Sequence, residues 1–426
     1  MRIGFFTDNY LPSRDGIAIS VETFKQQLEA QGHDVYVITP APNLTYNEDS
    51  DKIIRFPAFK GLFYEDYLTS LFLPLQAMKK IDELNLDIVH YHTLGQVGFL
   101  GAYYGMKRNL PLVSTYHTDY YQYVKYYKKT LPGVMALSLI TPVVTGGGLT
   151  DYRSAILNIK PEKTIDEWNQ KIVEKAVTTL HNACDVVIAP SLKIKNQLES
   201  WNTTSPIIIL PTGVDKIPAT KDEMNNWRKK FNISTETQVI AYVGRLGNEK
   251  NLGLLLNAFE IISRKLGNVK LLVIGGSGSQ SEDVDSNNSN NFNEHMKNDN
   301  IIFTGYVPHA ELGALYGLST VFAFPSQSDT QGLVLNEAAQ AGLPIVLIDH
   351  EITDVVKDGE NGLFSKPNAD DMASKIISIL ESSEISSKMS KNSINISKEY
   401  TAKKQSDKIL KIYENLITTY EHKIVL

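Results

Sequence analysis

Two acidic residues, Asp329 and Glu337, bracket a glycine-containing turn in the stretch SQSDTQGLVLNEAAQAG. The apolar run 320–324 before it is typical of a buried parallel strand, and apolar residues repeat at helical spacing over 333–341. The sequence therefore predicts a strand, a tight polar loop and a helix, whose N-terminal amides and positive dipole end suit a diphosphate. The alternative is a helix capped by Ser328 or Asp329, with Glu337 on a solvated face.

Glu337 would lie inside the predicted helix. An unpaired carboxylate buried there would be costly, because it would lose its hydration without gaining a partner. We therefore expect a ligand hydroxyl to form a hydrogen bond with Glu337, while Asp329 lies on the loop before the helix.

Two cations, Arg245 and Lys250, follow the apolar run 239–243 in the loop GRLGNEKNL. The glycines of this loop, Gly244 and Gly247, allow a ligand to approach the backbone closely. Positive charges at the carboxyl end of a strand are well placed to neutralise a leaving diphosphate. A surface loop that merely carries charges is the alternative.

Two further candidates lie in the first third of the chain. His117 follows the apolar run 112–116 in STYHTDYY, at the rim where open α/β sheets bind ligands, although a lone histidine is more often structural or solvated. Gly16 lies in the loop DNYLPSRDGIAIS, between a predicted strand at 3–7 and a helix at 20–30. The backbone there either approaches a ligand or only turns. This loop has no GxGxxG pattern, so a nicotinamide cofactor is not predicted.

A DxD triplet, Asp283-Val284-Asp285, superficially matches a metal-binding motif. It lies in a polar, Asn- and Ser-rich stretch at 277–291, which we predict to be a flexible surface loop. A metal site needs rigid ligands beside a strand. We therefore predict no metal site and no metal cofactor.

Several separated motifs resemble one known family. The stretch around Asp329 and Glu337 resembles the Glu-x7-Glu region of the retaining family 4 glycosyltransferases of GT-B fold, with Asp329 in place of the first Glu. The loop of Arg245 and Lys250 is similar to the GR…EKN pattern of that family, and PTGVD at 211–215 resembles its passage between domains. The tripeptide TQG after Asp329 and the segment TYHTDYYQYVKYY resemble the subgroup that glucosylates diacylglycerol.

The resemblance implies a site for a UDP-sugar donor, with UDP-glucose expected. Glu337 would hold the ribose hydroxyls, and Asp329 and His117 the sugar hydroxyls. Arg245 and Lys250 would stabilise the leaving UDP without a metal, while backbone amides near Gly332 bind its phosphates. The implied catalytic residues are His117, Arg245, Lys250 and Asp329, and the implied donor-binding residues are Gly16, Tyr306, Val307, Thr330, Gln331, Gly332, Leu333, Val334 and Glu337.

The elements that must position these residues alternate between strand and helix. Further strands are predicted at 35–39, 87–92, 185–189, 207–210, 270–274 and 344–349, and helices at 164–180, 192–200, 369–381, 385–397 and 400–422. This order predicts an α/β protein, and the resemblance implies the GT-B fold, with two Rossmann-like, doubly wound parallel-sheet domains facing across a cleft. We expect an acceptor-binding domain at 1–215, a nucleotide-sugar-binding domain at 216–398, and a helix at 399–426 that crosses back to the first domain.

The composition narrows the possible functions. A chain of 426 residues, 42% hydrophobic and 21% charged, is typical of a globular protein of roughly two to three domains. The net charge of −6 gives no support to a nucleic-acid partner. The single cysteine, Cys184, excludes an intramolecular disulfide and fits a reducing compartment.

The composition of one segment after His117 is typical of a helix that contacts a membrane surface. Its candidate surface residues are Tyr120, Tyr123, Lys125, Tyr127, Lys128 and Lys129. Tyrosines with flanking lysines suit an anionic bilayer interface, whereas a core-facing helix with a solvated edge is the alternative. No apolar stretch reaches the length of a signal-peptide core or a spanning helix. We therefore expect a cytoplasmic protein bound peripherally to the inner face of the cell membrane.

The sequence and the resemblance together favour a retaining transfer of glucose from UDP-glucose to a lipid acceptor, with 1,2-diacylglycerol expected. One alternative keeps the donor but uses a protein, a wall polymer or a soluble sugar as acceptor. Another is a degenerate, non-catalytic GT-B subunit that binds a partner. The presence of His117, Arg245, Lys250 and Glu337 argues against this last alternative, and Asp329 argues slightly for it.

Overall fold

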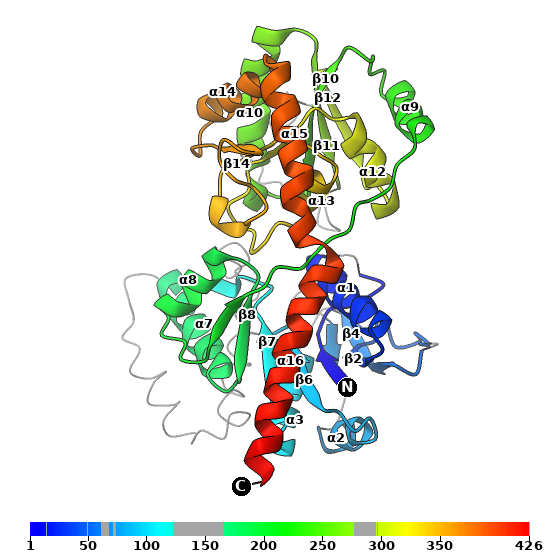
Figure 1. The fold of residues 1–426 in the computed structure, drawn as a ribbon, viewed down its shortest axis with the longest axis vertical. Helices are drawn as coiled ribbons and strands as arrows, with labels where there is room; N and C mark the ends of the chain where they lie inside the picture. The colour runs from blue at the N-terminus through cyan, green and yellow to red at the C-terminus, as the bar shows by residue number, and fades with distance from the viewer. Residues whose placement is uncertain are drawn as a thin grey trace. The chain divides into compact units, whose positions relative to one another are not determined.

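The computed structural model describes residues 1–13, 15–48, 50–60, 68–70, 74–121, 165–276, 295 and 297–425. The chain divides into two compact units. The first unit comprises Met1–Gly213 and Ala402–Leu426, and the second comprises Val214–Thr401. Each unit is built around its own parallel sheet, with helices on its faces (Figure 1).

The first unit contains a seven-stranded parallel sheet in the order β3-β2-β1-β6-β7-β8-β9. Its strands are short and mostly apolar, as expected of parallel strands covered on both faces. They span Arg2–Phe6 (β1), Asp34–Pro40 (β2), Ile53–Phe56 (β3), Ile88–Tyr91 (β6), Leu112–Thr115 (β7), Val186–Ala189 (β8) and Ile207–Ile209 (β9). A separate antiparallel pair is formed by Ala58–Lys60 (β4) and Leu68–Ser70 (β5).

Helices from both ends of the chain cover the first sheet. They span Gly16–Ala30 (α1), Pro74–Asp82 (α2), Gln96–Arg108 (α3), Ile165–His181 (α7), Leu192–Ser200 (α8) and Ala402–Val425 (α16). The last of these, α16, packs against α1 (Figure 1). Its side chains Ile409 and Tyr413 are fully buried in one core with Ile3 and Phe5. Burial of this apolar face therefore fixes the C-terminal helix to the first unit.

The second unit contains a six-stranded parallel sheet in the order β12-β11-β10-β13-β14-β15. Its strands span Gln238–Val243 (β10), Val269–Ile274 (β11), Ile301–Gly305 (β12), Val321–Phe324 (β13), Ile345–Leu347 (β14) and Gly362–Phe364 (β15). Its helices span Lys221–Lys230 (α9), Leu252–Leu266 (α10), His309–Leu318 (α12), Leu333–Gln340 (α13), Ala369–Leu380 (α14) and Ser383–Ser397 (α15). Short 3-10 turns occupy Asn248–Lys250 (η2), His350–Ile352 (η3) and Lys398–Tyr400 (η4).

Both sheets reverse their strand order next to their first strand. The reversal lies between β1 and β6 in the first unit and between β10 and β13 in the second. In doubly wound folds, ligands bind outside the carboxyl ends of the strands at this point. The loops that follow these four strands are therefore the places to look for a site in each unit.

The predicted α/β class, with two doubly wound sheets, is confirmed. The strand predicted at 320–324 is β13, and the helix predicted at 333–341 is α13, each within a residue. Helix α1 begins at Gly16 rather than at residue 20, because the Asp15 carboxylate accepts hydrogen bonds from two amides of its first turn. The predicted loop at 277–291, with its DxD triplet, lies outside the described residues.

Candidate active site

The loops after the adjacent strands β10 and β13 meet through an ion pair. Lys250 Nζ donates to Asp329 Oδ1 at 2.6 Å, and both side chains are largely buried. Two further bonds join the same loops: Ser328 Oγ donates to the Glu249 carbonyl at 2.9 Å, and Asn251 Nδ2 to the Pro325 carbonyl at 3.5 Å. Two residues that sequence analysis placed in one site, Lys250 and Asp329, therefore lie side by side at the reversal of the second sheet.

The charge of Arg245 is exposed, whereas that of Lys250 is largely buried. The backbone carbonyl of Arg245 accepts a hydrogen bond from the Tyr242 hydroxyl at 2.9 Å, which fixes the start of the loop. Its guanidinium is 58% exposed and lies 3.2 Å from Glu249 Oε1. The Glu249 side chain is only 11% exposed, so the pair joins an exposed cation to a largely buried acid. The guanidinium is thus accessible to an incoming anion.

The turn into α13 depends on Gly332. Its φ of 69° lies in the left-handed region, where a side chain would be strained, and it serves as the N-cap of the helix without a side-chain hydrogen bond. The alternative of a cap by Ser328 or Asp329 is therefore wrong. Thr330, Gln331, Leu333 and Val334 surround this turn and are buried or partly buried.

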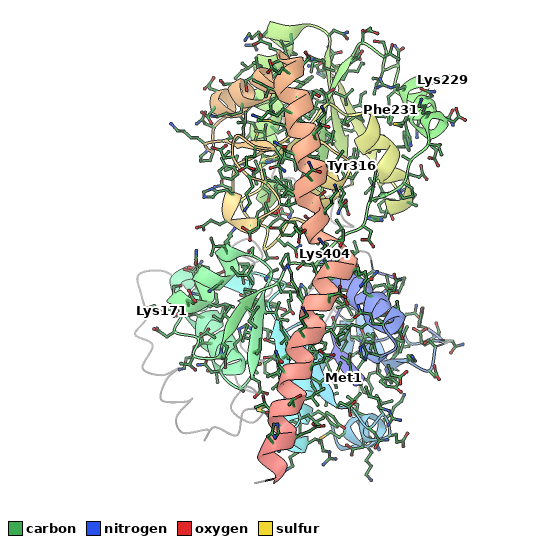
Figure 2. The ribbon with its side chains drawn as sticks, in the orientation of Figure 1. Met1, Lys171, Lys229, Phe231, Tyr316 and Lys404 are labelled. Atoms are coloured by element: carbon green, nitrogen blue, oxygen red, sulfur yellow. The ribbon has the colours of Figure 1, made fainter. Side chains whose placement is uncertain are left out.

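Glu337 is inside α13 and only 5% exposed. The alternative that Glu337 lies on a solvated face of the helix is therefore also wrong. Its carboxylate has partners within the second unit: the Tyr316 hydroxyl donates to Oε2 at 2.8 Å, and His309 Nε2 lies 3.0 Å from Oε1. The carboxylate is therefore not unpaired in the absence of a ligand, and its expected hydrogen bond with a ligand hydroxyl stays a prediction. Tyr316 lies among the interior side chains of the second unit (Figure 2), and burial and Glu337 raise the pKa of its hydroxyl well above the usual range.

Tyr316 and His309, both on α12, are site residues that sequence analysis missed. A signal for Tyr316 was present, because a tyrosine inside the apolar helical run LGALYGL needs a buried partner for its hydroxyl. His309 gave no comparable signal, since its ring is half exposed.

Tyr306 and Val307 follow β12, which lies in the sheet on the side of β10 opposite to β13. Tyr306 is 66% exposed and Val307 is buried. The loops after β10 and β11 pass closely, since a side chain at Gly275 would meet the Gly244 carbonyl at 2.0 Å, and the Gly275 amide donates to the Gly305 carbonyl at the end of β12 at 3.1 Å. A glycine at position 275 is therefore required for these loops to pack against one another at the edge of the sheet.

His117 and Gly16 lie in the first unit. His117 follows β7 and is partly buried, and burial lowers its pKa to about 3, so the ring is neutral at pH 7. Its Nε2 lies 3.1 Å from Nδ1 of His92, which follows the neighbouring strand β6. Gly16 is exposed at the start of α1, where the Asp15 carboxylate already caps the helix.

The predicted membrane-surface segment is described only at its start. The Leu94 amide donates a hydrogen bond to the hydroxyl of Tyr120 at 3.2 Å, and the Tyr120 ring packs against the core of the first unit. Tyr120 is thus partly buried with contacts inside the first unit, and its place at a membrane surface stays a prediction. The remaining predicted residues, Tyr123, Lys125, Tyr127, Lys128 and Lys129, lie outside the described residues.

Family models match most of the chain. The one described as Glycosyltransferase Family 4 matches residues 14–216, and the one described as Glycosyl transferases group 1 matches residues 223–396. Two doubly wound units with loops meeting at the sheet reversal define a protein of the GT-B fold. The chain belongs to glycosyltransferase family 4 and is a glycosyltransferase, as the sequence motifs predicted.

Relatives and solved structures extend this result. The alpha-monoglucosyldiacylglycerol synthase of Acholeplasma laidlawii is 28% identical over 437 residues, which cover 100% of this chain and 99% of that protein. The enzyme of the same description from Streptococcus pneumoniae is 28% identical, over 81% of this chain and 70% of its own. The fold is similar to that of Anabaena HepE in complex with UDP-glucose, with a TM-score of 0.69, 14% identity, and coverage of 97% of this chain and 100% of HepE.

Proposed function

We propose that the protein transfers glucose from UDP-glucose to 1,2-diacylglycerol, with retention of configuration at the anomeric carbon. The observation that carries the acceptor is the similarity to an alpha-monoglucosyldiacylglycerol synthase over the full length of both chains. The donor is supported by the cationic loop beside Asp329, and by the likeness of the fold to a structure that holds UDP-glucose.

The second unit would bind the donor. Lys250 and Arg245 would neutralise the diphosphate, with Asp329 released from Lys250 to meet the sugar hydroxyls. Glu337 has about four lone-pair directions, so its carboxylate can accept ribose hydroxyls while it keeps the bond from Tyr316. Amides of the first turn of α13, which has no side-chain cap, would bind phosphate oxygens.

The transfer would then be a substitution on one face of the sugar. The bond from the anomeric carbon to the phosphate oxygen breaks, and a bond from the same carbon to the acceptor oxygen forms. The acceptor proton passes to the leaving phosphate oxygen, so UDP leaves as it accepts that proton. Lys250 and Arg245 would lower the barrier by stabilising the charge that develops on UDP.

We propose that these two cations take the place of a metal. A chelator should then leave most activity intact, and replacing both Asp283 and Asp285 by Ala should be silent. Strict dependence of the rate on an added divalent cation would contradict this assignment.

Membrane binding is proposed to be peripheral. In the part of the chain that the structure describes, no helix is both long and apolar enough to cross a bilayer. Lys125, Lys128 and Lys129 would each add about 1 kcal/mol of attraction to an anionic surface. Replacing all three by Glu should reduce co-sedimentation with anionic vesicles at low salt and leave UDP-glucose affinity unchanged. Equal vesicle binding by the wild type and this variant would remove the proposed surface.

The acceptor is tested by supplying labelled UDP-glucose with vesicles that contain diacylglycerol, and separately with protein, wall-polymer and soluble-sugar acceptors. We expect a glucosylated lipid with an α-linkage, identified by NMR of the isolated product. The Lys250→Ala variant serves as the control for contaminating activity. Transfer to a protein, wall polymer or soluble sugar, with none to diacylglycerol, would favour the alternative in which the donor is the same and the acceptor differs. Absence of both transfer and UDP release would favour a non-catalytic subunit.

A further inference from the structure

A buried arginine lies beside the loop that follows the first strand of the first sheet. Arg55 belongs to β3, and its side chain is only 7% exposed. Its guanidinium donates hydrogen bonds to three separate segments: Nη2 to the Leu11 carbonyl at 2.6 Å, Nη1 to the Pro40 carbonyl at 2.9 Å, and Nε to Glu48 at 2.8 Å. Leu11 lies in the loop after β1, Pro40 ends β2, and Glu48 lies in the loop after β2. One side chain thus joins three parts of the chain near the carboxyl edge of this sheet.

Two tyrosine rings flank the guanidinium. Its carbon lies 4.8 Å from the centroid of the Tyr46 ring and 5.7 Å from that of the Tyr10 ring, so cation–π attraction adds to the hydrogen bonds. Tyr10 belongs to the loop after β1 and is 5% exposed, and its hydroxyl donates to Glu22 on α1. The loop is therefore held from two directions, by β3 through Arg55 and by α1 through Glu22.

The set of acceptors explains why this residue is an arginine. A guanidinium carries five N–H donors in a planar fork, whereas a lysine ammonium is a compact point charge. Two of the three acceptors, the Leu11 and Pro40 carbonyls, are uncharged backbone groups, so pairing with Glu48 alone would not need this geometry. The arrangement therefore fixes the backbone of two segments as well as balancing a charge.

The loop that Arg55 holds lies where a ligand of the first unit is expected. Strand β1 is one of the two strands at the reversal of the first sheet, and doubly wound folds bind ligands outside the carboxyl ends of these strands. The loop after β6, the other strand, is joined to the same place, because the Asp8 amide donates to Thr93 Oγ1 at 2.8 Å. A ligand at this edge would therefore meet backbone whose position depends on Arg55.

We propose that Arg55 is a positioning residue that orders the loop after β1 for binding of the acceptor. This rests on the proposed function, in which the second unit takes the donor and the first unit takes the acceptor. Arg55 acts through the loop rather than by touching the acceptor. Because the loop is ordered before the acceptor arrives, binding costs less conformational entropy. Loss of the guanidinium should then weaken acceptor binding and leave the donor site unchanged.

Arg55→Lys tests this role. The variant keeps a positive charge beside Glu48 but cannot reach both carbonyls. We expect KM for diacylglycerol in vesicles to rise about tenfold or more, the size of a lost hydrogen bond from a charged donor. The affinity for UDP, measured by calorimetry, should stay within about twofold of wild type. Hydrogen exchange should become faster in peptides that cover residues 7–13 and stay unchanged in the second unit.

Arg108→Lys is the matched control. Arg108 donates to Asp82 at 2.8 and 2.5 Å, and its guanidinium carbon lies 5.9 Å from the centroid of the Tyr104 ring, so the same exchange removes the same kinds of contact. It lies in the last turn of α3, which leads into the amino end of β7 and so away from the loop after β1. We expect its KM for the acceptor to equal that of wild type.

Tyr10→Phe is a second variant of the same loop. It removes only the hydroxyl that donates to Glu22 and keeps the buried ring. Since one of the two supports of the loop is lost, KM for the acceptor should rise about three- to fivefold, again with UDP affinity unchanged.

A folded Arg55→Lys variant with the acceptor KM of wild type would overturn the proposal, as would an equal rise in Arg108→Lys. Should Arg55→Lys not fold, an unchanged acceptor KM in Tyr10→Phe would overturn it. The proposed function fails separately, if wild type transfers glucose to an acceptor other than diacylglycerol. The change in KM for that acceptor then still decides the role of Arg55.

Discussion

The two units share one strand order, but the helices that follow the two strands at the reversal, α1 and α3 in the first unit and α10 and α13 in the second, begin in opposite ways. In the first unit the Asp8 carboxylate accepts hydrogen bonds from the amides of Val97 and Gly98, at 2.8 and 3.2 Å, in the first turn of α3. Asp15 does the same for α1. In the second unit, α10 and α13 begin at Asn251 and Gly332 without a side-chain cap.

This difference separates what each unit can bind. A carboxylate of the protein already occupies the position at α3 where an anionic ligand would lie, and burial raises the pKa of that Asp8. In the second unit no side chain caps the first amides of α10 and α13, and the loop before α10 adds the cations Lys250 and Arg245. In the first unit, His92 and His117 follow β6 and β7 instead, and burial lowers their pKa so that both rings are neutral at pH 7. Under the proposed function, one topology would serve an anion in the second unit and uncharged hydroxyl groups in the first.

The largest expected effect distinguishes the units by their response to acid. Burial lowers the pKa of His90, His92, His117 and His181, all in the first unit. Their unfolded pKa is about 6.5, so below that pH the unfolded chain binds protons that the folded unit cannot. Stability is therefore full above about pH 6.5 and is lost as pH falls. At pH 5.5 the four together cost roughly 5 kcal/mol.

Hydrogen exchange at pH 7.5 and 5.5, corrected for intrinsic rates, measures this loss by region. We expect β6 and β7 to lose protection, and β10 and β13 to lose less. In the second unit His295 lies 3.2 Å from Glu260 of α10, His309 lies on α12 and His350 on η3. His181→Phe should reduce the response by about a quarter, because it removes one of the four groups. Equal losses in both units would contradict this contrast.

Asp329 carries the next largest effect. Asp329→Ala should abolish transfer, lowering kcat/KM by about a thousandfold or more, since both the sugar contact and the partner of Lys250 are lost. Asp329→Glu restores the carboxylate with one more methylene and should keep or improve the rate with UDP-glucose. If both variants behaved like wild type, Asp329 would have only a structural role in the loop.

The third largest effect is expected from removing Lys250 or Arg245. Lys250→Ala or Arg245→Ala should lower kcat/KM by about a hundredfold, as expected when a group that stabilises developing charge is removed. Lys265→Ala, which breaks a surface pair with Glu381 in the same unit, is the control and should be silent. Steady-state kinetics with matched thermal denaturation separates these effects from unfolding. Activity within a few-fold of wild type in both variants would remove the diphosphate assignment.

Local signals account for what the sequence predicted well. The apolar run and glycine around 320–341 predicted β13, the turn and α13, because each depends on neighbouring residues. The partners of Glu337 were missed because Tyr316 and His309 lie 21 and 28 residues away. Contacts between side chains of separate helices depend on packing, which periodicity does not encode.

The smallest predicted effect tests one of those missed partners. Tyr316→Phe removes the donor to Glu337 Oε2 and keeps the buried ring, so folding should change little. If Glu337 holds the ribose, its carboxylate becomes less well oriented, and affinity for UDP should fall about five- to tenfold, the size of one hydrogen bond. UDP and UDP-glucose should weaken alike, because they share the ribose. Calorimetric titration of UDP measures this, and a double-mutant cycle with Glu337→Gln locates its origin. Tyr316→Phe should add almost nothing in the Glu337→Gln background. An undiminished effect there would mean that Tyr316 acts through packing, leaving the ribose assignment of Glu337 without this support.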